Sequence, residues 1–236
     1  MNELNTILRR LRSLANPRNV EGMARFGIRS RKAFGIGANT LRAIARKIGR
    51  DHTLAQQLWN TDIFETRILA ALVDEPAKVT ERQMEKWVQG FDNWAVCDGC
   101  CGVLFDKTPF AWKKAVEWSK RKEEFVKRAG YVLMATLTVH DKKASAIQFI
   151  RFLPHIKRGA VDERNFVKKA VNWALRQIGK RNLHLNRLAI KTAREIHTMD
   201  SSSAKWISSD ALRELTGAAV QRRVKKRTQH GYESAR

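Results

Sequence analysis

A five-residue pattern that recurs along the chain is the feature that most constrains its fold. Phe-Val-Lys-Arg-Ala at residues 125–129 returns as Phe-Val-Lys-Lys-Ala at residues 166–170, 41 residues later, and a weaker copy, Phe-Glu-Thr-Arg, stands at residues 64–67. A period of about 40 residues is typical of helix pairs that stack into a solenoid. In such an array, Phe and Ala of the pattern should face the neighbouring repeat, and the basic residue at the fourth position should lie on one shared surface.

The composition agrees with an all-α protein. Only 4 Pro and 13 Gly occur in 236 residues, and long stretches of Ala, Leu, Ile, Lys, Arg and Glu dominate. These residues favour helices, and strands with alternating hydrophobicity are hard to find. We therefore expect an α-solenoid of helix-pair repeats with the period of HEAT and armadillo proteins, curved, with a concave basic face. Residues 1–216 should form one domain, followed by a basic, flexible tail at 217–236.

Apolar periodicity and punctuation residues place the helices. Capping boxes are expected at Asp62…Glu65 and Thr80…Gln83, a cap at Thr40 and a stop at Gly49. The Gly-rich basic link at residues 26–39 lacks the spacing of a nucleotide-binding loop, so a turn that packs on the next helix is the favoured interpretation. The expected helices span residues 1–15, 19–26, 40–48, 52–59, 62–74, 80–89, 93–105, 109–118, 123–139, 142–153, 162–180, 183–198 and 208–215.

The charge points to a polyanionic partner. The chain carries 46 Lys and Arg against 23 Asp and Glu, which gives a net charge of +23. Nucleic acid is the favoured partner, and an anionic membrane is disfavoured because the basic residues are spread along the chain. A basic protein with no dedicated partner is the alternative. No apolar run is long enough to span a membrane, and three clustered Cys predict a reducing, cytoplasmic location, near the nucleoid in a prokaryote.

The stretch Asn-Trp-Ala-Val-Cys-Asp at residues 93–98 holds the most informative pair of side chains. Trp94 and Asp98 are four residues apart, so a helix would place them on one face, one turn apart. A single carboxylate in a cationic chain is suited to stabilising positive charge that develops on a substrate. Cys97 and Cys100 have a metal-like spacing, but a structural zinc needs four ligands, so no metal is expected.

These residues resemble the AlkD-like family of DNA alkylation repair proteins. The resemblance rests on the segments NWAVCD, VKRAGYVL and KKAVNWALRQIGK and extends from about Phe26 to Leu215. It implies a HEAT-like solenoid that binds duplex DNA and hydrolyses the N-glycosidic bond of N3- or N7-alkylated purines, such as 3-methyladenine and 7-methylguanine. It also implies an enzyme without a cofactor that does not draw the base into a pocket, and a monomer suits such a protein.

By the same resemblance, Asp98 is the catalytic carboxylate, and Trp94 and Trp173 contact the sugar and backbone of the damaged nucleotide. Arg128 is expected to hold a phosphate near the lesion, and Lys169 and Arg176 are further expected DNA contacts. Two other hypotheses remain open at this point. One is a non-catalytic HEAT-repeat protein that binds nucleic acid, and the other is a protein-binding scaffold with a basic surface.

Overall fold

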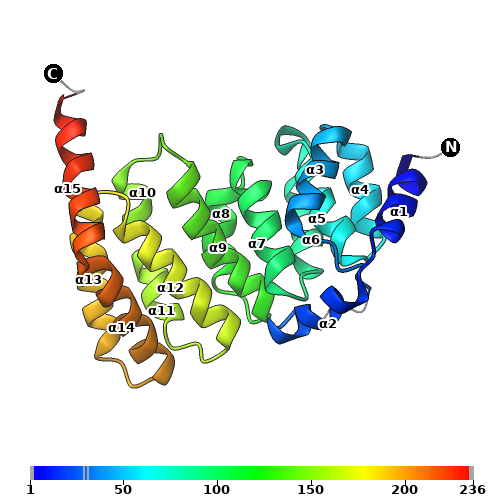
Figure 1. Cartoon of the computed structure of the whole chain (residues 1–236). Coiled ribbons are helices and arrows are strands. Elements are labelled where there is room, and N and C mark those ends of the chain that lie inside the picture. The colour runs from blue at the N-terminus through cyan, green and yellow to red at the C-terminus, as the bar shows by residue number, and fades with distance from the viewer. Residues whose placement is uncertain (1–2, 29, 31, 234–236) are drawn as a thin grey trace. The chain divides into compact units, whose positions relative to one another are not determined.

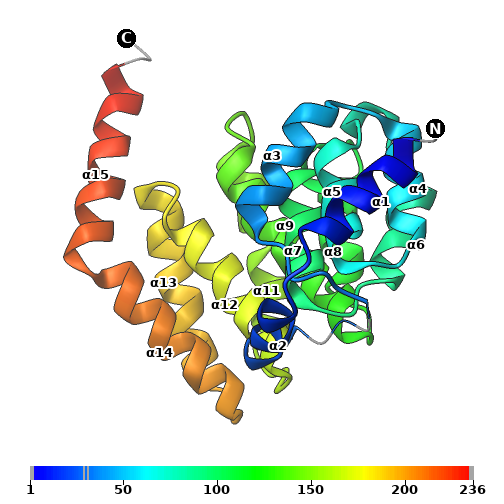
Figure 2. The same cartoon turned by 45° about the vertical axis from the view of Figure 1, so that its right-hand side comes forward.

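The computed structural model describes residues 3–28, 30 and 32–233, with side chains up to residue 226, and every regular element among them is a helix (Figures 1 and 2). The expected all-α class is thereby confirmed. The chain divides into two compact units, Met1–Phe110 and Ala111–Arg236. None of the described helices is long and apolar enough to cross a membrane. The single domain expected over residues 1–216 stays a prediction.

Unit 1 contains seven α-helices and two short 3-10 helices among its described residues. They are α1 (Glu3–Ser13), α2 (Pro17–Arg25), α3 (Ala38–Ile48), α4 (His52–Asn60), α5 (Phe64–Val73), η1 (Pro76–Lys78), α6 (Glu81–Gln89), α7 (Trp94–Val103) and η2 (Phe105–Lys107). Helix α5 packs against α3, α4 and α7. Arg67 of α5 lies over the ring of Trp59, which stacks on Trp87 with ring centroids 4.2 Å apart. Stacked indoles of this kind contribute burial and a preferred geometry to the core.

Unit 2 continues with longer helices. They are α8 (Ala111–Trp118), α9 (Glu124–His140), α10 (Ala146–Ile150), α11 (Leu153–Gly159), α12 (Asn165–Gly179), α13 (Leu183–His197), α14 (Ser202–Thr216) and α15 (Ala218–Glu233). Helices α9 and α12 pack side by side, and α12 also packs on α13 and α14 (Figure 1). Gly130 lets α8 approach α9, because a Cβ there would lie 2.4 Å from the backbone nitrogen of Ser119.

The repeated pattern does what its spacing predicts at its apolar positions. The rings of Phe125 on α9 and Phe166 on α12 are in contact, with centroids 5.4 Å apart. Ala129 and Ala170 are both fully buried. The expectation for the fourth position is wrong, because Lys169 is exposed whereas Arg128 is buried. The two copies therefore share a packing role but do not present their cations on one surface.

Glu65 has a different role from the one that its spacing predicts. The helix cap of α5 is Ile63, and the Glu65 carboxylate is fully buried and accepts three backbone N–H groups from the Gly-rich link. Its oxygens lie 2.9 Å from the nitrogen of Phe34, 2.7 Å from that of Gly35 and 3.2 Å from that of Ile36. The amides of this link thus bind an internal carboxylate, and the link is the packed turn that the sequence favours.

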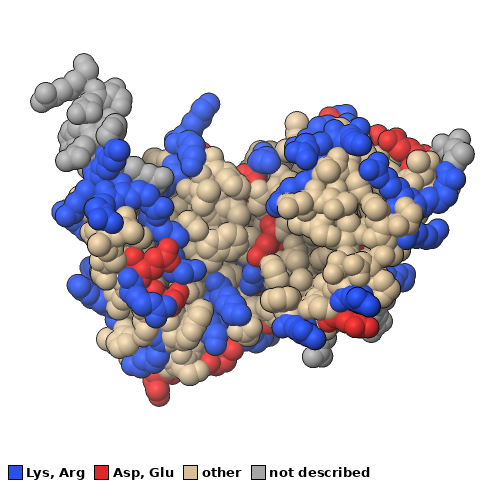
Figure 3. All heavy atoms as spheres, in the orientation of Figure 1, with Lys and Arg blue, Asp and Glu red and all other residues tan. Residues whose placement is uncertain are grey.

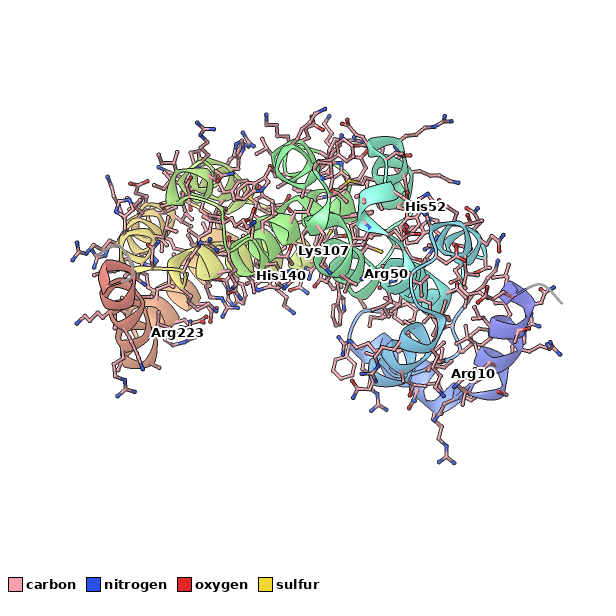
Figure 4. The ribbon with its side chains drawn as sticks, turned by 90° about the horizontal axis from the view of Figure 1, so that it is seen from above. Arg10, Arg50, His52, Lys107, His140 and Arg223 are labelled. Carbon is pink, nitrogen blue, oxygen red and sulfur yellow. The ribbon has the colours of Figure 1, made fainter. Side chains whose placement is uncertain are left out.

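A second buried carboxylate explains why the other expected capping box is only half formed. Thr80 accepts the backbone N–H of Gln83 at 3.1 Å, as predicted. The side chain of Gln83 instead donates to Asp74, at 2.6 Å, and His52 contacts the same carboxylate at 2.7 Å. Asp74 is fully buried. His52, which is labelled in Figure 4, is the first residue of α4. Asp74 therefore ties α4 to α6, which is a structural role.

Three helical segments differ from the sequence predictions. Residues 142–153 were expected to form one helix, but α10 ends at Ile150 and α11 begins at Leu153, with Pro154 in its first turn. Pro is tolerated there because a helix's first N–H groups have no partner within the helix. Helix α14 begins at Ser202, capped by Ser201, where a loop was expected. Helix α3 begins at Ala38 with Gly37 as its cap, so Thr40 lies inside it.

The segment expected to be a tail begins where predicted but is helical over most of its length. Helix α14 ends at Thr216 and α15 starts at Ala218. Val220 and Val224 are buried, four residues apart on one face of α15, and α15 packs on α13 and α14. The expected flexibility of residues 217–236 stays a prediction. The contacts of Val220 and Val224 would have to break for α15 to move.

Candidate functional site

Helix α7 positions Trp94 and Asp98. Asn93 caps the helix, since its side-chain oxygen accepts the N–H groups of Ala95 and Val96, each at 3.0 Å. One side of α7 is fully buried and includes Val96 and the three Cys residues. Trp94 and Asp98 lie one turn apart and are both partly exposed, as the four-residue spacing predicts. Figure 3 shows acidic atoms at the surface over α7.

Trp94 is held in place by a residue far away in the sequence. Its indole N–H donates to the carbonyl of Phe26 at 2.8 Å. Phe26 follows the last residue of α2, and its own side chain is 71% exposed. The backbone of Phe26, a residue with an exposed ring, therefore contacts Trp94. Sequence reasoning missed Phe26, although an aromatic residue at the start of a basic link was the available signal.

The three cysteines beneath the pair are packing groups. Cys97, Cys100 and Cys101 form no disulfide and have no exposed surface. Burial raises the pKa of both Cys100 and Cys101 well above its usual value, and the Asp98 carboxylate adds to the effect at Cys101. In the part of the chain that the structure describes, no group of three or more His, Cys, Asp or Glu side chains is arranged to hold a metal ion.

In unit 2, helix α12 carries three of the predicted residues on one face. Lys169, Trp173 and Arg176 follow one another at spacings of four and three, which aligns them along the helix. Lys169 is exposed and Trp173 is partly exposed. Arg176 is engaged by α14, where it lies 3.2 Å from the Asp210 carboxylate and 2.7 Å from that of Glu214. Its guanidinium charge is thus already partly compensated within unit 2.

Arg128 occupies a structural position. It is only 6% exposed, and its guanidinium donates from α9 to the carbonyl of Phe166 on α12. A buried guanidinium is costly unless its N–H groups are bonded, so this contact is part of how the two helices are joined. A phosphate contact for Arg128 stays a prediction. The same holds for Arg176, whereas Lys169 and Trp173 have the exposure that a DNA contact requires.

The described geometry therefore defines two groups of residues. Trp94 and Asp98 form a partly exposed aromatic and acidic pair in unit 1, and the carbonyl of Phe26 holds Trp94. Lys169 and Trp173 form a basic and aromatic strip on α12 in unit 2. The stacked helices and the pattern that recurs after 41 residues define the chain as a helical-repeat protein. The two groups of surface residues make up its candidate binding site.

Comparison with known proteins identifies the family. The model of the DNA alkylation repair enzyme family matches residues 7–215, which is most of the chain. The chain belongs to this family, and its class of activity is DNA alkylation repair. The family named from the resemblance of residues 93–98 and the two repeat helices is thereby confirmed.

Two individual proteins extend the comparison. An uncharacterized protein of Listeria innocua is 24% identical over 190 residues, which cover 79% of this chain and 83% of that protein. A solved structure, described as a new family of proteins related to the HEAT-like repeat DNA glycosylases with affinity for branched DNA structures, superposes with a TM-score of 0.74. It is 18% identical and covers 90% of this chain and 95% of that chain. The HEAT-like repeat fold is thereby shown.

Proposed function

We propose that this protein is a monofunctional DNA glycosylase that removes N3- and N7-alkylated purines, such as 3-methyladenine and 7-methylguanine, from duplex DNA. The observation that carries the proposal is the partly exposed Trp94–Asp98 pair on α7. Membership of the DNA alkylation repair enzyme family supports the same reaction class. We further propose that the protein acts as a monomer, in the compartment that holds the DNA.

The proposed mechanism needs only one carboxylate. Glycosidases whose leaving group is neutral generally use a second carboxyl group to protonate it. A purine alkylated at N3 or N7 already carries a positive charge, so it leaves without being protonated. The Asp98 carboxylate then stabilises the oxocarbenium-like sugar and orients the attacking water. The reaction consumes water, breaks the bond between C1′ and the base nitrogen, and leaves an abasic site.

The aromatic residues supply positioning. Trp94 packs against the deoxyribose and favours the cationic nucleotide through its ring face. Its hydrogen bond to the Phe26 carbonyl fixes the indole plane before DNA arrives, which reduces the ordering cost of binding. Trp173 and Lys169 contact the backbone from α12. Because the nucleotide is read from its sugar and charge, the base need not enter a protein pocket.

The decisive experiment measures release of 7-methylguanine from methylated duplex DNA by the wild type and by Asp98→Asn. We expect the wild type to release the base, and the variant to lose at least about 100-fold in rate, the scale of removing a group that stabilises transition-state charge. Binding of the same duplex should change by less than about threefold. Asp200→Asn, an exposed carboxylate next to α14, is the matched control and should release base at the wild-type rate.

Equal release by Asp98→Asn and wild type would assign the chemistry to another residue. No release by either protein, together with tight duplex binding, would favour the second candidate, a DNA-binding member without excision activity. That candidate draws support from the structural relative, which is described as having affinity for branched DNA structures. It predicts tighter binding of a four-way junction than of a linear duplex of equal length.

A further inference from the structure

An open cavity of about 620 Å³ lies in unit 2, whereas Trp94 and Asp98 belong to unit 1. It is bordered by the end of α9 and the turn after it, by the turn between α12 and α13, and by α15. Its volume lies within the range of ligand pockets. No Asp or Glu is among its lining residues. The polar residues that line it are Thr138, Lys142, Gln177, Lys180, Arg181, Asn182 and Arg223.

Arg181 makes one wall of the cavity rigid. Its guanidinium donates to the carbonyls of Thr138 and Asp141, each at 2.7 Å, and to that of Ala144 at 3.0 Å. It also lies over the Phe149 ring, 4.3 Å from the centroid. These contacts fasten the turn after α9 to the turn after α12. They also hold a permanent positive charge at the wall, since an Arg guanidinium does not lose its proton.

Two further cations stand at the cavity on exposed side chains. Lys142 extends from the turn after α9, and Arg223 extends from α15, where it is labelled in Figure 4. Among the described residues, no carboxylate pairs with Arg223. Lys180 contributes a partly neutralised charge, because it bonds to Glu214 at 2.7 Å. In Figure 3, Lys and Arg atoms predominate on the part of unit 2 where α15 lies.

The backbone adds to the same electrostatic preference. Asn182 caps α13 and lines the cavity, so the amino-terminal end of α13 borders the cavity. The unpaired N–H groups of a helix's first turn carry a partial positive charge. The fixed Arg181 guanidinium, the exposed cations and the helix amino terminus together favour an anion, and Gln177 and Asn182 supply neutral polar contacts.

We propose that this cavity binds consecutive phosphate groups of a nucleic-acid strand, as a second contact separate from the group on α7. Exposed cations on two elements, Lys142, whose ammonium also donates to the Val139 carbonyl, and Arg223, can each meet a different phosphate, while Arg181 supplies a fixed field. The mixed lining of charged and polar residues suits a backbone rather than a base, because Phe149 is buried beneath Arg181 and offers no open ring. The proposal does not depend on base excision.

Charge reversal at the two exposed cations tests it. The double variant Lys142→Glu with Arg223→Glu is compared with Lys143→Glu and Arg222→Glu, which are also exposed and directly adjacent but do not line the cavity. Both variants change the net charge equally. Affinity is measured by fluorescence anisotropy with an unmodified single strand of roughly 12 nucleotides. Repeating the titration over a range of salt concentrations yields the slope of log Kd against log salt.

We expect the cavity variant to bind at least about tenfold more weakly than the control variant. Its salt slope should be shallower by about 1.4, since each lost phosphate contact removes about 0.7 for single strands. Equal weakening in both variants would overturn the proposal in favour of a general field, and no weakening in either would remove the cavity from DNA binding. Binding of inorganic tripolyphosphate that is lost in the cavity variant, together with unchanged oligonucleotide binding, would replace the nucleic-acid strand by a small polyphosphate.

Discussion

The buried Glu65 carboxylate accepts hydrogen bonds from three backbone N–H groups that would otherwise need water. It thereby fixes the link that precedes α3. The link that it holds contains Gly35 at φ 75°, where a Cβ would lie 2.3 Å from the carbonyl oxygen of Asn16. The tight turn and the buried anion therefore depend on each other. A sequence pattern identifies Glu65 only as a residue near a helix start, because its partners lie about 30 residues earlier.

Replacing Glu65 by Gln should lower the free energy of unfolding by about 2 kcal/mol, because an amide NH₂ cannot accept from the N–H groups of residues 34–36. Urea unfolding followed by circular dichroism measures the change. Glu75→Gln is the control, since Glu75 is partly exposed and paired with Lys78. It should cost less than about 0.5 kcal/mol. Equal losses in the two variants would mean that the contacts of Glu65 do not stabilise the fold.

Arg128 and Lys169 offer a matched comparison, because they occupy the same position in the two copies of the repeat. Arg128→Lys should destabilise the protein by about 1–2 kcal/mol, since a Lys point charge cannot keep the buried contact with the Phe166 carbonyl. Lys169→Arg should leave stability within about 0.5 kcal/mol. Thermal and urea unfolding decide this. If Arg128→Lys weakened DNA binding with no loss of stability, the structural role assigned to Arg128 would be wrong.

At the scale of elements, carboxylates in the turn before α12 join this helix to α9 and to α14 in unit 2. The side chain of Asp162 bonds to Lys127 of α9 at 3.0 Å and to Arg164, which precedes α12. Burial alone would raise the pKa of Asp162, but the bonds from Arg164 and Lys127 outweigh it and lower that pKa to about 2. Glu163 likewise accepts from Ser201, Ser202 and Ser203 at the start of α14.

The pKa of Asp162 determines how its contribution depends on pH. The folded value lies below the unfolded value of about 3.9, so the stabilisation is present above about pH 4 and is lost as pH falls towards 2. Asp162→Asn should therefore cost about 1–2 kcal/mol at pH 7 and almost nothing near pH 2. Urea unfolding at both pH values tests this. A cost that did not change with pH would assign the effect to packing rather than to charge.

Local signals predicted the elements well where the element's own residues decide its limits. Asn93, Thr80 and Gly49 cap or end helices as their types predict, and the Trp94–Asp98 face follows from spacing alone. The errors arise where distant partners decide. Glu163 accepts from all three residues of the Ser run at 201–203 and adds to the local cap by Ser201 at the start of α14, and Arg176 is paired because Asp210 and Glu214 lie on α14. Such partners, about 38 residues away, leave no local signal.

At the scale of the whole molecule, the net charge of +23 has a measurable consequence. Binding to unmodified duplex DNA should weaken steeply with salt, with a slope of log K against log salt steeper than about −4, because bound phosphates release counterions. Anisotropy titrations between low and physiological salt give this slope. Asp98→Asn should show the same slope, since it removes no phosphate contact. A DNA affinity that hardly changes with salt concentration would mean that the net positive charge does not act in nucleic-acid binding.

The buried thiols of α7 determine how the protein responds to electrophiles. Alkylating agents attack thiolates, and Cys97, Cys100 and Cys101 are the only cysteines of the chain. They have no accessible surface, and Cys100 and Cys101 stay protonated at neutral pH because their pKa is raised. The three thiols are therefore poor targets for alkylating agents. Iodoacetamide can label these thiols only when unit 1 opens. The rate of labelling therefore reports how often that opening occurs.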